Sequence, residues 1–230
     1  MTSPWDEPSE TEGELELSIL QAAVAPEAEG AYRLLLRTTR GDIFGLLHVC
    51  EGEPGAAVMI GGASGGLDGP ADGIYARLAP ALLDAGVSTL RLHYRWPGEF
   101  DECLLDVLGA LSFLKGVGAR RAVLVGHSFG GAVAIRAGTL SPLVSGVVAM
   151  SSQLHGTEQV AELAPRPLLL VHGMEDQVLE AVASEIIYQR AAEPKRLVLY
   201  AEAGHSLVQC KDALFELLRE WIPVHARGDG

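Results

Sequence analysis

The chain has few cysteines, few basic residues and no long apolar run. Its three cysteines, Cys50, Cys103 and Cys210, are odd in number and widely spaced among 230 residues. This pattern predicts free thiols in a reducing compartment and argues against a disulfide framework or a paired-cysteine metal site. No segment approaches the roughly 18 apolar residues of a membrane helix, and the first residues lack the basic start and apolar stretch of a signal peptide. We therefore expect a cytoplasmic protein that does not enter a membrane.

Basic residues are scarce enough to disfavour polyanionic partners. The chain has 17 Lys and Arg against 30 Asp and Glu, a formal net charge of −13, which argues against nucleic acid and anionic membranes. Residues 1–30 hold eight acidic residues and no Lys or Arg. We expect an acidic, flexible tail over 1–30, with a short amphipathic helix over 15–24 as the alternative. Residues 31–230 are then a single domain.

Apolar runs alternate with helical periods from residue 31 onward. The strand-like runs are short and rich in Val and Leu, as in parallel strands that are buried on both faces. They lie near residues 31–38, 43–50, 56–61, 87–93, 121–126, 144–151, 167–172 and 196–200. Helical spacing is found near residues 71–85, 100–114, 128–140, 179–192 and 207–221. This alternation predicts the α/β class, with a mostly parallel sheet covered by helices on both faces.

The most informative motif follows the run at residues 121–125. Residues 126–131 read GHSFGG, a G-x-S-x-G pattern between a strand and a helix of small residues. This is the nucleophile elbow, in which Ser128 stands at the apex of a strained turn. The glycines leave room where a β-carbon would collide with neighbouring elements. The amino end of the following helix favours a negative charge close to the serine.

A serine hydroxyl needs a base, and the base needs an orienting carboxylate. Asp176 follows the run at 167–172 and His205 follows the run at 196–200. The order Ser128, Asp176, His205 is the one expected for this architecture. Glu175 is the competing acid. His172 ends a strand, and we expect it to fix the acid loop rather than react.

His127 flanks the serine, and we expect it to be structural and to point toward the sheet. The remaining histidines show no ligand spacing to one another, so no metal site is expected. They are His48, His93, His155 and His225.

Acyl transfer also needs two N–H donors for the developing oxyanion. One is expected from Phe129, the residue after the nucleophile. The other is expected from the glycine-rich loop at residues 61–66, where we assign Ala63, with Gly62 as the alternative. This loop lacks the Lys-Ser/Thr ending of a P-loop and the spacing of a dinucleotide fingerprint, so no cofactor is expected.

Together these motifs resemble the α/β-hydrolase family over about residues 31–223. The similarity is greatest to small bacterial members of the dienelactone-hydrolase and carboxylesterase or thioesterase type. The resemblance implies an eight-stranded sheet with an antiparallel second strand, and a triad of Ser128, Asp176 and His205. Dienelactone hydrolases proper use a cysteine nucleophile, and this chain has Ser128 in its place.

Members of this family that carry a lid usually insert it between the sixth and seventh strands. Here only residues 152–166 are available, which is room for a short helix and not for a cap domain. The resemblance therefore implies an open site walled by loops. Trp96 and Leu154 are candidates for an apolar substrate wall, and ordinary packing is the alternative for each.

These observations predict a serine hydrolase that acts on small-molecule esters or thioesters of small to medium acyl groups. Two other functions use the same scaffold: an acyltransferase with the same triad, and a non-catalytic ligand-binding protein. The sequence does not indicate an oligomeric state.

Overall fold

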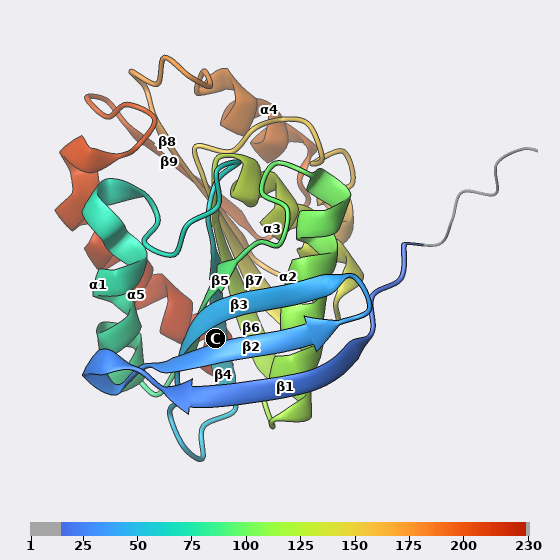
Figure 1. Cartoon of the computed structure of the whole chain (residues 1–230). Helices are drawn as coiled ribbons and strands as arrows, with labels where there is room; N and C mark the ends of the chain where they lie inside the picture. The colour runs from blue at the N-terminus through green and yellow to red at the C-terminus, as the bar shows by residue number, and fades with distance from the viewer. Residues whose placement is uncertain (1–14, 229–230) are drawn as a thin grey trace, which may run out of the picture.

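Nine strands form one mixed sheet in the computed structural model, which describes residues 15–228 (Figure 1). The strand order is β1-β2-β3-β5-β4-β6-β7-β8-β9. The strands are β1 (Ile19–Pro26), β2 (Tyr32–Thr38), β3 (Gly41–His48), β4 (Gly55–Ile60), β5 (Ser88–His93), β6 (Arg121–His127), β7 (Val144–Met150), β8 (Leu168–Gly173) and β9 (Lys195–Tyr200).

The sheet changes from antiparallel to parallel pairing at β5. Strands β1, β2 and β3 form an antiparallel meander, and β3 pairs antiparallel with β5. From β5 through β4 to β9 every pairing is parallel. All residues of β4 and β8 are buried, as expected of parallel strands that carry helices on both faces. Parallel strands end at one edge, so the loops that follow β4, β6, β8 and β9 meet there.

Helices cover both faces of the sheet. They are α1 (Pro70–Asp84), α2 (Phe100–Gly116), α3 (Phe129–Leu140), α4 (Val182–Arg190) and α5 (Lys211–Arg227). Helices α1 and α5 lie on one face, and α2 and α3 lie on the other (Figure 1). Alternate residues of β6 enter the two cores: Leu124 packs on the α2 and α3 side, and Val123 and Val125 on the α1 and α5 side.

All eight expected strands are present, and β1 is an additional ninth. The prediction of a flexible tail through residue 30 is therefore wrong for residues 19–26, and so is the alternative of a helix over 15–24. These residues pair with β2 through the main chain, while most of their side chains stay exposed. A strand that is held mainly by backbone hydrogen bonds shows little apolar alternation in its sequence, because its side chains need not be buried. Residues 1–14 of the expected tail lie outside the described residues.

The segment between β7 and β8 carries no cap domain. It holds only one 3₁₀ turn, η2 (Val160–Leu163), packed beside α3. The prediction of a minimal cap is confirmed. Two further 3₁₀ turns, η1 (Ala28–Gly30) and η3 (Val208–Cys210), precede β2 and α5.

Across residues 15–228, none of the helices combines the length and the apolar character needed to cross a bilayer. The three cysteines are free, as expected from their spacing. Cys103 is buried, and Cys50 and Cys210 are partly buried.

Candidate active site

Ser128 occupies a strained turn between β6 and α3. Its φ of 57° and ψ of −122° lie outside the region that L-residues ordinarily adopt. Two backbone hydrogen bonds hold this turn: the Ser128 N–H donates to Met150 O at 2.8 Å, and the Gly131 N–H donates to Ser128 O at 3.0 Å. Strain of this kind persists only where the surroundings hold it in place, and it concentrates at functional sites.

The glycines around Ser128 are required by close backbone approaches. A β-carbon on Gly126 would collide with the carbonyl oxygen of Gly130, and one on Gly130 would collide with that of Gly61. A β-carbon on Gly131 would lie 2.8 Å from the side chain of Ser152. The elbow can therefore pack against β4 and the β7 loop only with glycine at these positions.

Asp176 is held as a buried carboxylate after β8. Its Oδ1 accepts hydrogen bonds from the N–H groups of Val178 (2.8 Å) and Leu179 (2.9 Å), and its Oδ2 accepts from His205 Nδ1 at 2.7 Å. Burial by itself raises the pKa of Asp176, but these hydrogen bonds to the charged form outweigh it and leave the pKa below its ordinary value. Glu175 is exposed to solvent, so the structure brings Asp176 rather than Glu175 to the histidine.

His205 has its tautomer fixed by Asp176. The carboxylate can only accept, so the Nδ1 of His205 carries the hydrogen and its Nε2 is left with a lone pair. The acid and histidine loops are joined by the main chain, since the Glu175 N–H donates to Ala203 O at 3.0 Å.

His127 brings the histidine loop to the elbow. Its Nε2–H donates to His205 O at 2.9 Å, and the two rings are 4.8 Å apart. Burial lowers the pKa of His127 to about 4, so the ring is neutral near pH 7 and keeps a single N–H for this bond. The expectation of a structural role fits this contact, but the side chain faces the His205 loop rather than only the sheet.

Ser128, Asp176 and His205 thus come from distant segments to one edge of the sheet. Within residues 15–228 the Ser128 hydroxyl forms no hydrogen bond to His205, whereas the His205–Asp176 bond is formed. Catalytic hydrogen bonds are often long without substrate and tighten when it binds.

His172 is a second histidine on the same carboxylate. Its Nε2 lies 3.1 Å from Asp176 Oδ2 and 2.9 Å from Leu179 O, and its Nδ1 lies 2.7 Å from Ser184 Oγ. Both partners of Nε2 are acceptors, so Nε2 carries a hydrogen. His172 and Ser184 are fully buried. His172 therefore fixes the acid loop, as expected, whereas nothing in the sequence pointed to Ser184.

The expected oxyanion donors lie on the two sides of the elbow. Phe129 is the first residue of α3, where an N–H has no partner within the helix. Ala63 lies in the loop after β4, in which Gly62 and Gly65 form an isolated bridge. A β-carbon on Gly62 would lie 3.6 Å from the Ser128 β-carbon, which shows how closely this loop approaches the nucleophile.

The two expected wall residues differ in exposure. Trp96 is 58% exposed on the loop after β5, and Leu154 is half-buried against the core on the α2 and α3 side. The Trp96 loop is anchored by Arg95, whose guanidinium is buried and forms an ion pair with the buried carboxylate of Asp106. Only tertiary contact reveals this pair, because the two residues are 11 positions apart on different elements.

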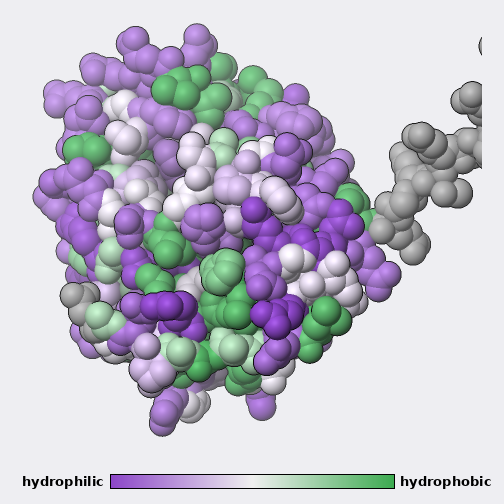
Figure 2. Space-filling view, viewed as in Figure 1, coloured by the Kyte–Doolittle hydropathy of each residue, from purple (hydrophilic) through white to green (hydrophobic). Residues whose placement is uncertain are grey.

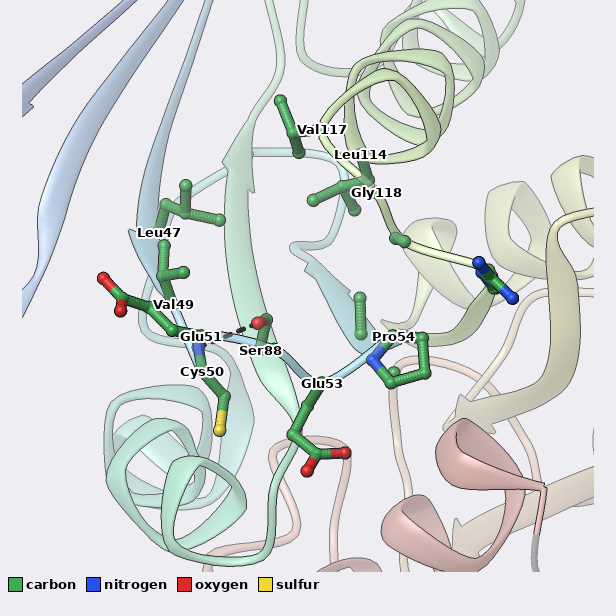
Figure 3. Close-up of a pocket in the computed structure, with 15 residues that line it drawn as sticks. Leu47, Val49, Cys50, Glu51, Glu53, Pro54, Ser88, Leu114, Val117 and Gly118 are labelled. Carbon is green, nitrogen blue, oxygen red and sulfur yellow. Dashed lines mark hydrogen bonds between the residues drawn. The ribbon is translucent and has the colours of Figure 1, made fainter.

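A hollow of about 640 Å³ lies at the other end of the sheet (Figure 3). Its lining includes Gly55 and Ser88, which begin β4 and β5, together with Val117 after α2. These are the amino ends of the strands, so the hollow is remote from the loops that carry Ser128 and His205. Within the described residues, no three His, Cys, Asp or Glu side chains are grouped so that they could hold a metal ion.

Comparisons with known proteins find similarity in sequence over part of the chain and in fold over most of it. A model of the phospholipase/carboxylesterase family matches residues 106–215, a segment that contains Ser128, Asp176 and His205. An uncharacterized protein of Escherichia coli (strain K12), YfhR, is 32% identical over a segment that covers 39% of this chain and 39% of that protein. The match thus spans about two fifths of the curated relative's own length.

Solved structures resemble most of the chain. Dienelactone hydrolase from Anabaena variabilis has a TM-score of 0.71 and 19% identity, and the match covers 90% of this chain and 98% of that one. An α/β serine hydrolase without a lid from Xanthomonas campestris has a TM-score of 0.65 and 17% identity, with 86% and 97% covered. The chain thus has the α/β-hydrolase fold without a cap, and its second half is similar to the phospholipase/carboxylesterase family.

Proposed function

We propose that this chain is a serine hydrolase that cleaves small-molecule carboxylic esters or thioesters of small to medium acyl groups. The observation that carries the proposal is a strained serine at a strand-to-helix turn, beside a histidine already oriented by a buried aspartate. The match to the phospholipase/carboxylesterase family supports the ester class. The likeness to an α/β serine hydrolase without a lid supports an open site.

The first half-reaction transfers the acyl group to the serine. Ser128 Oγ attacks the carbonyl carbon while His205 Nε2 takes the hydroxyl proton. Asp176 stabilises the resulting imidazolium through Nδ1–H. The Phe129 and Ala63 N–H groups donate to the oxyanion of the tetrahedral intermediate. When the carbon–oxygen or carbon–sulfur bond breaks, His205 returns the proton to the leaving alcohol or thiol.

The second half-reaction releases the acid. A water molecule loses a proton to His205 Nε2 and attacks the acyl-enzyme carbonyl, which forms a second oxyanion at the same two N–H groups. Collapse breaks the bond to Ser128 Oγ, and His205 protonates the serine. In this proposal Trp96 and Leu154 line the acyl side of the site, because both lie on loops at the carboxyl edge of the sheet.

The Ser128→Ala variant tests the nucleophile. We expect turnover of p-nitrophenyl esters to fall by several orders of magnitude, because no other group replaces the nucleophile. The melting temperature should stay within about 2 °C, because the hydroxyl makes no hydrogen bond in the described structure. A fluorophosphonate probe should label the native chain and not the variant. Esterase activity retained by Ser128→Ala would refute the assignment.

A substrate series then distinguishes the hydrolase from other functions of the scaffold. Hydrolysis of p-nitrophenyl esters of rising chain length, with acyl-thioesters alongside, measures the acyl preference. Product analysis with added alcohol separates the two triad reactions: an acyltransferase yields mostly a new ester, and a hydrolase yields mostly free acid. A chain that neither reacts with the probe nor turns over esters would be a binding protein.

A further inference from the structure

Two buried tyrosines hold consecutive carbonyl groups where β4 enters the oxyanion loop. The Tyr75 hydroxyl donates to Ile60 O at 2.9 Å, and the Tyr94 hydroxyl donates to Gly61 O at 3.3 Å. Tyr75 lies on α1 and Tyr94 follows β5, so the donors come from separate elements. Neither tyrosine takes part in the chemistry proposed above.

The next carbonyl is held as well. The Gly65 N–H donates to Gly62 O at 2.9 Å within the loop's own turn. In a trans peptide the C=O and the N–H that follows it lie in one plane and point in opposite directions, so a held carbonyl fixes the direction of that N–H. The Gly62 carbonyl therefore directs the Ala63 N–H away from the turn. The two tyrosines orient the two peptide planes immediately before it.

Tyr94 also contacts the other side of the elbow. Its ring meets the ring of Phe129 edge to face, with centroids 6.2 Å apart and an interplanar angle of 86°. Phe129 supplies the other proposed donor N–H. Gly130, the next residue, packs its backbone against the same Gly61 oxygen that accepts from Tyr94. One side chain thus touches both segments that carry the proposed donor N–H groups.

We propose that Tyr94, assisted by Tyr75 from the opposite face of the sheet, is a positioning residue that holds the two oxyanion donors at a fixed separation. This inference rests on the proposed function. Burial raises the pKa of both hydroxyls, so both remain protonated donors at any working pH. Donors aimed before the reaction stabilise the developing charge without reorganisation, and a small displacement is costly.

The Tyr94→Phe variant removes only the hydroxyl and keeps the ring contact with Phe129. We expect kcat to fall roughly ten-fold with KM within about two-fold, because the oxyanion contact is made in the transition state and not in the ground state. The inhibition constant of a boronic acid, whose serine adduct is tetrahedral, should rise by a similar factor. Tyr75→Phe should have a smaller effect in the same direction, since Ile60 O is one peptide further from Ala63.

The matched control is Tyr32→Phe, on β2, which should leave kcat and the boronic acid constant unchanged. Tyr32 is exposed, and its hydroxyl has no hydrogen bond among the described residues. Rates are expressed per site labelled by a fluorophosphonate, so that misfolded protein does not count. If Tyr94→Phe does not fold, Tyr75→Phe decides by the same two measurements.

Two results would overturn the inference. One is a Tyr94→Phe enzyme with native kcat and native boronic acid affinity, even if its melting temperature falls. The other is a loss of kcat without any loss of boronic acid affinity, which would place the defect outside the oxyanion site. Failure of the proposed function is distinct, because the native chain would then show no turnover that depends on Ser128.

Discussion

The Asp176 carboxylate accepts four hydrogen bonds, from His205, His172 and two backbone N–H groups. It is buried, so each lost partner leaves an oxygen that water cannot reach, at a cost of about 1–3 kcal/mol. The same bonds favour the charged form and hold the pKa of Asp176 below its ordinary value. Orientation of the histidine and stability of the fold are thus linked through one side chain.

This link predicts that the stability of the fold depends on pH. Because the pKa of Asp176 is lower in the folded than in the unfolded state, its contribution to stability is full above about pH 4 and is lost as the pH falls through the folded-state value. We expect Asp176→Asn to lower the free energy of unfolding by roughly 1–3 kcal/mol at pH 7. The difference from the native chain should shrink toward pH 3. Urea unfolding at several pH values measures it.

Asp106 provides the opposite control. Burial raises its pKa in spite of the Arg95 partner, so its charged form becomes a cost as the pH rises through that raised value. The free energy of unfolding of the native chain should therefore fall, relative to that of Asp106→Asn, as the pH rises.

For Asp176, a difference in free energy of unfolding between the native and Asp176→Asn proteins that stayed constant from pH 7 to 3 would contradict the role assigned to the Asp176 carboxylate.

At the scale of elements, the β6–α3 turn depends on glycines, which have no side chain to keep the backbones apart. The backbones of Gly126 and Gly130 approach so closely that a β-carbon on Gly126 has no space. Strand, turn and helix therefore form one rigid unit that aims Ser128. A substitution here acts on the geometry of the whole elbow and not on one contact.

Gly126→Ala should therefore destabilise the chain by about 3 kcal/mol or more, because the obstructing atoms are backbone and cannot move aside. Esterase activity should be lost even in the protein that remains folded. Gly116→Ala, at the end of α2 where a β-carbon meets nothing within 4 Å, is the control and should be neutral or stabilising by up to about 1 kcal/mol. Thermal and urea unfolding of both variants checks this. A Gly126→Ala protein with native stability would show that the turn is looser than described.

At the scale of the molecule, the antiparallel meander and the site occupy separate parts of the sheet. In the order of strands across the sheet, β1 stands first, and β6, which leads to Ser128, stands sixth. Figure 2 shows apolar and hydrophilic residues mixed over this meander, and exposed apolar side chains there include Leu20, Val24 and Phe44. β1 therefore adds backbone pairing and little buried area.

Deletion of residues 1–26 tests this separation. We expect the melting temperature to fall by roughly 2–8 °C, since about 1–2 kcal/mol of strand pairing and half-buried contact is lost. kcat should stay within about two-fold, because no group of the site lies on β1. Substitution of Val24 by Lys on the exposed strand should change neither quantity and serves as the control. A folded deletion variant with a ten-fold lower kcat would mean that the meander supports the site.

The sequence by itself determined the eight core strands, the elbow and the order of the three proposed catalytic residues. Local pattern carries these features: buried parallel strands are continuous apolar runs, and an elbow needs glycines at fixed spacing. Strand β1 was not predicted, because it forms through backbone pairing while most of its side chains stay exposed to water.

Only the tertiary structure decided which acid meets His205. Asp176 and Glu175 are adjacent in the chain, and the choice depends on which side chain the loop turns inward. It also decided the partners of Ser184, Tyr75 and Tyr94, whose contacts join segments that no local pattern connects. Side-chain spacing reports the face on which a residue lies, whereas hydrogen-bond partners are set when the loops at the sheet edge pack together.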